Sequence, residues 1–80
     1  MAEAAREGRF SFQVWPKDHN PPHVHVVWAD GICKIRLLTA RFVPGFEPPA
    51  GMSRQIKEAY KKHAREIRTK WEELHPEQGT

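Results

Sequence analysis

The sequence predicts an α+β domain in which a three-stranded antiparallel β-meander packs on one long C-terminal helix. Three observations support this fold class. Apolar residues alternate over 10–15, an Asp-Gly dipeptide at Asp30-Gly31 separates two β-branched runs, and an apolar stripe of helical period covers 53–75. Strands that precede a single helix in this way are typical of an α+β domain.

The length of 80 residues predicts one domain, which we place at residues 9–76. Residues 1–8 are polar and carry no capping signal, so they are expected to be flexible, and residues 77–80 are expected to form a disordered tail. A chain this short buries only about 60% of its unfolded surface. A protein partner or a homodimer is therefore an open alternative to a stable monomer.

The first predicted strand covers residues 10–15 and ends at Pro16. One face carries Phe10, Phe12 and Val14, and the other carries Ser11, Gln13 and Trp15. Because one face is apolar and the other is largely polar, this strand is expected to be half buried, with Trp15 pointing away from the core.

The second and third predicted strands, residues 24–29 and 32–38, are joined by Asp30-Gly31, the dipeptide preferred in a two-residue type I′ turn. That turn would place His25 opposite Arg36. The core face would then carry Val24, Val26, Trp28, Cys33, Ile35 and Leu37. The outer face would carry His23, His25, Val27, Ala29, Ile32, Lys34 and Arg36.

A loop rich in proline and glycine at 41–51 leads to the predicted helix, 53–75, with Ser53 as its N-cap and Pro76 beyond its end. Its apolar stripe spans about 140° at 100° per residue. The stripe consists of Ile56, Ala59, Tyr60, His63, Ala64, Ile67, Trp71 and Leu74. This face is expected to cover the sheet.

The net charge is only +3, but residues 54–70 hold seven Lys and Arg residues and two Glu residues. On one flank of the predicted helix, basic residues recur every three or four positions and form a stripe roughly 20 Å long. This basic stripe consists of Arg54, Lys57, Lys61, Arg65 and Arg68. It would suit a nucleic acid or an acidic partner, or it is a solvated helix face.

Residues 18–26 read Asp-His-Asn-Pro-Pro-His-Val-His-Val and hold three of the five histidines. Because imidazole titrates near neutral pH, such a cluster suits proton transfer, anion binding or metal ligation. This motif resembles the central signature of a bacterial family known as domain of unknown function 4160. The aromatic strand before the motif and the tryptophan at Trp71 agree with that family, whereas the loop at 42–51 is longer and richer in proline.

The resemblance implies a small component of a toxin–antitoxin type pair, with a protein partner encoded nearby and a nucleic acid as a candidate target. It supplies no catalytic assignment.

The single cysteine, Cys33, and the absence of a signal-peptide pattern or an apolar span of ~20 residues lead us to expect a cytoplasmic protein without membrane contact.

Our first functional hypothesis is that the outer face of the sheet binds RNA or DNA and cleaves RNA without a metal. His23, His25 and Arg36 are the candidate catalytic residues, because such cleavage needs a base, an acid and a fixed cation. The candidate nucleic-acid contacts are Trp15, His19, Lys34, Arg36 and the basic stripe. No cofactor is expected under this hypothesis.

Two alternatives remain open. In the first, His23 and His25 bind Zn²⁺ or Ni²⁺ together with a third ligand, which is His19 or Asp18, although Lys34 and Arg36 would repel a cation. In the second, the histidines and prolines only shape the turn, and the protein acts through its surfaces as an antitoxin or adaptor.

Overall fold

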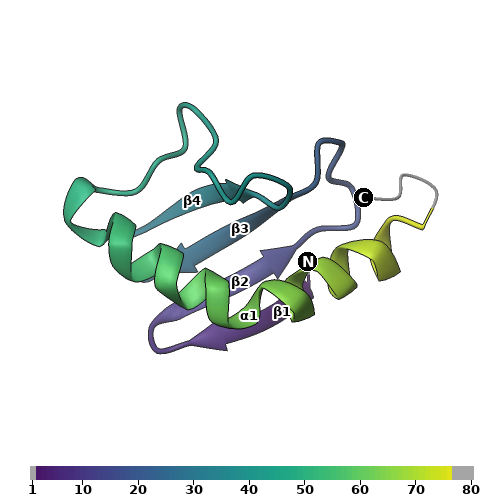
Figure 1. Cartoon of the computed structure of the whole chain (residues 1–80), viewed down its shortest axis with the longest axis horizontal. Helices are drawn as coiled ribbons and strands as arrows, with labels where there is room; N and C mark the ends of the chain where they lie inside the picture. Colours follow the sequence, from purple (N-terminus) through teal and green to yellow (C-terminus); the bar gives the residue numbers. More distant parts are fainter. Residues whose placement is uncertain (1, 77–80) are drawn as a thin grey trace.

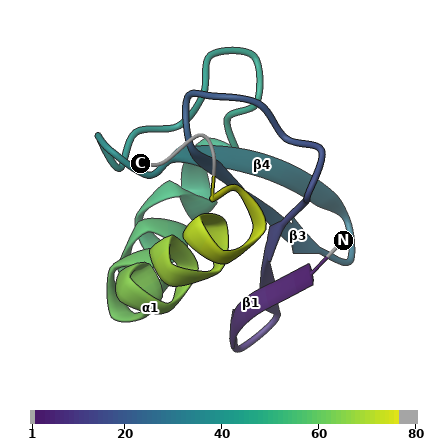
Figure 2. The same ribbon diagram turned by 90° about the vertical axis from the view of Figure 1, so that its right-hand side faces the viewer.

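The computed structural model describes residues 2–76. It has two layers: an antiparallel sheet in the order β1-β2-β3-β4 and a long helix, α1, across one face (Figures 1 and 2). The strands are β1 (Ala2–Glu7), β2 (Phe10–Val14), β3 (His23–Trp28) and β4 (Gly31–Arg36). A short 3-10 helix, η1 (Ala50–Met52), leads into α1 (Ser53–Leu74). The α+β class is confirmed.

The prediction of three strands is wrong, because residues expected to be flexible form a fourth strand, β1. Its sequence, rich in alanine and glutamate, has little intrinsic strand preference. It forms because it pairs along the edge of β2, with an irregularity between Glu3 and Ala5, and because Ala4 and Ala5 pack against the core. The predicted tail at 77–80 lies outside the described residues.

The register of the β3–β4 hairpin also differs from the prediction. Trp28 pairs with Gly31, so the two-residue loop is Ala29-Asp30, and every cross-strand partner moves by two positions. His25 therefore lies opposite Lys34 rather than Arg36, and it is His23 that lies opposite Arg36. A shift of two positions leaves both faces unchanged.

In this register Gly31 makes a close contact with a side chain and does not form a glycine turn. Gly31 does not have a positive φ angle, which a type I′ turn would require of its second central residue. Instead the indole of Trp28 covers it, and a Cβ atom at Gly31 would lie 2.9 Å from Cζ2 of that ring. The glycine is needed for space.

The predicted core faces are confirmed in both layers. The sheet buries Phe10, Phe12, Val14, Val24, Val26, Trp28, Cys33 and Ile35, with Leu37 just beyond β4. The helix buries Ile56, Ala59, Tyr60, Ile67 and Trp71 and packs mainly against β1 and β2. Ser53 is the first helical residue rather than the N-cap, which is Met52 and makes no side-chain capping bond.

The proline-rich segment after β4 runs along the outer edge of that strand. Phe42 forms a bridge with Ile35, the amide of Val43 donates to the carbonyl of Lys34 (2.9 Å), and Lys34 donates to the carbonyl of Phe46 (3.1 Å). These bonds satisfy backbone groups at the edge of the sheet.

Within residues 2–76, no helix has the length and hydropathy of a membrane span.

Candidate functional site: an imidazole–carboxylate cluster beside a basic pocket

The turn between β2 and β3 carries the site. The Asp18 amide donates to the carbonyl of Trp15 (3.0 Å), and the Trp15 amide donates to Oδ2 of Asp18 (3.2 Å). The carboxylate of Asp18 thus closes its own turn, as Asp side chains often do. The peptide bond between Asn20 and Pro21 is cis, and β3 begins two residues later at His23.

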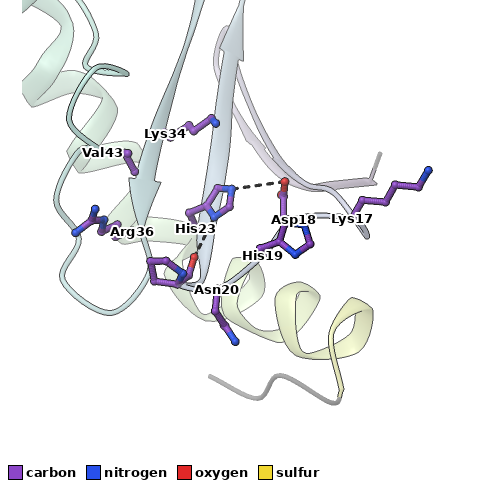
Figure 3. Close-up of a pocket in the computed structure, with 9 residues that line it drawn as sticks. Lys17, Asp18, His19, Asn20, His23, Lys34, Arg36 and Val43 are labelled. Carbon is purple, nitrogen blue, oxygen red and sulfur yellow. Dashed lines mark hydrogen bonds and ion pairs between the residues drawn. The ribbon is translucent and has the colours of Figure 1, made fainter.

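Two imidazoles from β3 converge on this carboxylate. His23 and His25 are two residues apart on one strand, so their side chains leave the same face. Nε2 of His23 lies 3.5 Å from Oδ1 of Asp18, and Nδ1 of His25 lies 3.5 Å from Oδ2. Figure 3 shows the contact between His23 and Asp18. We call these three residues the Asp18 cluster.

Aromatic rings hold both imidazoles in place. The ring of His25 stacks on Trp15, with centroids 3.8 Å apart and planes 9° apart. His23 contacts the ring of Trp71 from α1 at 5.7 Å, and Trp71 in turn stacks on His75 at 3.8 Å. The end of α1 therefore supports the start of β3.

His25 faces away from the core, as predicted, yet it is only 2% exposed because Trp15 and the turn cover it. Burial lowers the pKa of His25 below its usual value of 6.5, and the neighbouring His23 and Lys34 lower it further. The Asp18 carboxylate and a hydrogen bond to the Gln13 backbone act in the opposite direction. His25 is therefore largely neutral at pH 7.

A pocket of about 330 Å³ opens beside this cluster (Figure 3). Its lining residues are Lys17, Asp18, His19, Asn20, Pro21, His23, Lys34, Arg36 and Val43. Three of them are permanent cations and two are imidazoles, whereas Asp18 is the one carboxylate among the lining residues described. We call this the basic pocket.

The structure brings together four of the predicted site residues, His19, His23, Lys34 and Arg36, in the basic pocket. His25 lies beneath it rather than in its wall. Trp15 lies against His25, so one face of its ring is already occupied.

The basic stripe of α1 does not line the basic pocket. Arg54, Lys57 and Lys61 instead line a separate hollow of about 580 Å³ with Phe42, and Arg65 and Arg68 are exposed. The two candidate surfaces are therefore distinct.

Two further features were not predicted. Lys17 lines the pocket, although Figure 3 shows its side chain extending away from His23. Phe46 is 44% exposed, and the Lys34 ammonium lies 4.0 Å from the centre of its ring. Phe46 is distant from the His motif in sequence, and only the path of the loop along β4 brings it close.

Comparison with known protein families gives a match over most of the chain. A family model described as Domain of unknown function (DUF4160) matches residues 9–72. No curated protein and no solved structure matches the chain. The matched range contains β2, β3, β4, the His motif and nearly all of α1. The chain therefore belongs to the DUF4160 family.

Proposed function

We propose that this protein binds single-stranded RNA and holds a phosphate group of the RNA in the basic pocket. The observation that carries the proposal is the convergence of His23, Lys34 and Arg36 on one pocket of about 330 Å³. Register places Arg36 opposite His23, and Lys34 lies two residues before Arg36 on the same face of β4. Two fixed cations, Lys34 and Arg36, in this arrangement suit an oxyanion.

The surroundings of the pocket favour a nucleotide over a bare anion. Phe46 exposes an aromatic ring next to Lys34, and stacking on aromatic side chains is how bases of single-stranded RNA are commonly held. The Asp18 carboxylate is already in contact with two imidazoles, so its charge opposes a phosphate less than that of an isolated carboxylate would.

The burial of His25 favours binding over metal-independent cleavage. A general base must come within hydrogen-bond reach of the 2′-hydroxyl, and a side chain that is 2% exposed beneath Trp15 does not offer that access. His19 and His23 are the imidazoles that do line the pocket.

We also propose, from the family resemblance, that the protein acts within a toxin–antitoxin type pair. The resemblance carries this second proposal, and the exposed apolar side chains Ile32 (44% exposed) and Leu38 (65% exposed) are the positions at which we would test a protein contact. Replacement of Ile32 by serine should weaken the complex with the product of the neighbouring gene without changing RNA binding.

The test of RNA binding is an NMR titration of the labelled protein with a short single-stranded oligouridylate, in EDTA and at low salt. We expect shifts at His19, His23, Lys34, Arg36 and Phe46. Arg36→Ala should weaken binding about tenfold, as expected for loss of a charge-assisted hydrogen bond to phosphate. Arg65→Ala removes the same charge from the basic stripe and is the matched control, with little effect expected.

Two results would contradict the proposal. If shifts follow residues 54–68 and Arg65→Ala weakens binding more than Arg36→Ala, the RNA binds to the basic stripe. If no shifts occur at low salt, the protein does not bind RNA, and its function lies in protein contact.

A further inference from the structure

We propose that Asp18, His23 and His25 form a binding site for a divalent transition-metal ion of the Zn²⁺ type. One potential ligand atom from each residue lies within 4.8 Å of the others, close enough for one ion to be bound by all three. Two histidines and one carboxylate are an established ligand set for Zn²⁺ and for non-haem iron. This proposal goes beyond RNA binding and does not depend on it.

A hydrogen bond of His23 to the backbone leaves its Nε2 available as the nitrogen that would bind the metal. Nδ1 of His23 lies 3.0 Å from the carbonyl oxygen of Pro21. A carbonyl only accepts, so Nδ1 carries the proton and donates it. In the neutral ring, Nε2 is then the nitrogen with the lone pair, and it faces Asp18, where it can act as a metal ligand. A backbone carbonyl that fixes a histidine in this way is a usual outer partner of metal-bound imidazole.

The second imidazole, that of His25, has a buried nitrogen without a hydrogen-bond partner, and a metal ion at this position would be its partner. Nδ1 of His25 is buried and has no hydrogen-bond partner among residues 2–76, although it points at Asp18 from 3.5 Å. A buried polar atom without a partner is costly, and such atoms in native proteins often mark an ion or a water site. An ion between His25 and Asp18 would satisfy this nitrogen.

The cluster is rigid before any ion binds. Trp15 stacks on His25, Trp71 contacts His23, and the Trp15 amide donates to Oδ2 of Asp18. Fixed ligands lose little conformational entropy on binding, which favours affinity.

The positive charges of Lys34 and Arg36 disfavour some cations at this site more than others. They oppose a cation held by charge alone, such as Mg²⁺ or Ca²⁺, which also prefer oxygen ligands. An ion held by two imidazoles gains its affinity from nitrogen coordination. Three protein ligands leave a coordination position open, and Asp18 and His23 line the basic pocket, so an anionic fourth ligand could enter there.

The experiment is a calorimetric titration of the tag-free, chelator-treated full chain with ZnCl₂ at pH 7.5, without RNA. We expect one ion per chain. Asp18→Asn keeps the size of the side chain, and His23→Gln removes one imidazole. Each should weaken Zn²⁺ binding at least about 100-fold, more than loss of an outer partner does. His19→Ala removes a neighbouring exposed histidine and should leave the affinity unchanged.

Imidazole ¹⁵N spectra of the wild-type chain provide a readout that does not depend on any variant. Zn²⁺ should shift Nε2 of His23 and Nδ1 of His25, while Nδ1 of His23 keeps its proton. The proposal is wrong if the wild-type chain binds no Zn²⁺, if Asp18→Asn binds as tightly as wild type, or if His19→Ala abolishes binding.

The outcomes for the two proposals are separable, because the RNA titration is run in EDTA and the metal titration without RNA. RNA binding in EDTA with no Zn²⁺ binding would overturn the metal site alone. Zn²⁺ binding at the Asp18 cluster without RNA shifts would overturn RNA binding alone.

Discussion

The indole of Trp15 lies flat on the imidazole of His25, with centroids 3.8 Å apart and planes 9° apart. The sequence pattern placed Trp15 on the outer face and suggested that it stacks on a base. Part of that stacking surface is used within the protein, where it buries His25 and supports the Asp18 cluster.

Replacement of Trp15 by alanine should therefore destabilise the fold. The variant loses an aromatic pair and uncovers a buried imidazole, so we expect the free energy of unfolding to fall by about 1–2 kcal/mol. Urea denaturation measures this loss. Trp15→Phe keeps a ring over His25 and should recover most of the stability. If Trp15→Ala is as stable as wild type but binds RNA poorly, Trp15 is a ligand contact instead.

The faces of the strands and the helix could be predicted because apolar periodicity determines them. β1 could not, since Ala2–Glu7 contains no β-branched or aromatic residue. Pairing with β2 and packing of Ala4 and Ala5 decide its structure, and both are tertiary effects. The hairpin register was mispredicted for a related reason, because the dipeptide Asp30-Gly31 gives no sign that the Trp28 ring covers the glycine.

The sequence indicates which side chains gather at the candidate site, but not how they are arranged there. The His-X-His spacing on a strand correctly places His23 and His25 on one face. Within a turn, however, spacing does not determine which side chain points inward. Asp18 does so because its carboxylate accepts from the Trp15 amide, whereas His19 is exposed in the wall of the pocket.

The close contact at Gly31 predicts that Gly31→Ala destabilises the protein. A new Cβ atom would lie 2.9 Å from Cζ2 of Trp28, so this buried ring must shift, which disturbs its edge-to-face contact with Phe10. We expect a loss of about 1–3 kcal/mol in urea denaturation, as for other overpacked cores.

Gly51→Ala is the matched control for that experiment. An added Cβ at Gly51 meets nothing within 4 Å, and its φ angle is not positive. This variant should be neutral or more stable by about 0.4–1 kcal/mol, because alanine restricts the unfolded chain. Equal stability of the two variants would show that the Trp28 ring does not constrain position 31.

The Cys33 thiol should be unreactive in the folded protein. It is fully buried, and burial raises the pKa of Cys33 to about 12, so almost no thiolate is present at pH 8. A thiol-specific disulfide reagent should modify it only as fast as the protein opens, and urea should accelerate the reaction. Fast modification of the native chain at a rate that urea leaves unchanged would contradict this placement.

Cys33→Ala and Cys33→Ser test the same environment by equilibrium unfolding. Serine replaces the thiol with a hydroxyl in an apolar core between the sheet and α1. A buried hydroxyl without a partner costs about 1–3 kcal/mol, so the serine variant should be the less stable of the two. If serine is tolerated as well as alanine, position 33 is more hydrated than its burial indicates.

The pair of His63 and Glu7 joins α1 to β1 and predicts a pH dependence of stability. Nε2 of His63 lies 2.9 Å from Oε1 of Glu7, and Nδ1 lies 2.8 Å from Oε1 of Glu66. Hydrogen bonds to Glu7 and then to Glu66 raise the pKa of His63 above its usual value of 6.5. Hydrogen bonds from His63 and then Lys62 lower the pKa of Glu7 below 4.5.

The signs of the two shifts define a window of pH. Because the folded pKa of His63 is raised, its contribution is fully present below pH 6.5 and is lost as pH rises through the folded value. Because the folded pKa of Glu7 is lowered, its contribution is present above pH 4.5 and is lost as pH falls through the folded value. The stabilisation from this pair should therefore be greatest between these two limits.

Urea denaturation of wild type and Glu7→Gln at pH 5.5 and pH 8.5 measures this effect. The difference in free energy of unfolding should be larger at pH 5.5, where His63 is protonated and paired. Glu58→Gln, which removes the exposed i,i+4 partner of Arg54, is the control and should show the same small difference at both pH values. If the Glu7→Gln difference also stays constant, the His63–Glu7 contact does not hold β1 against the helix in solution.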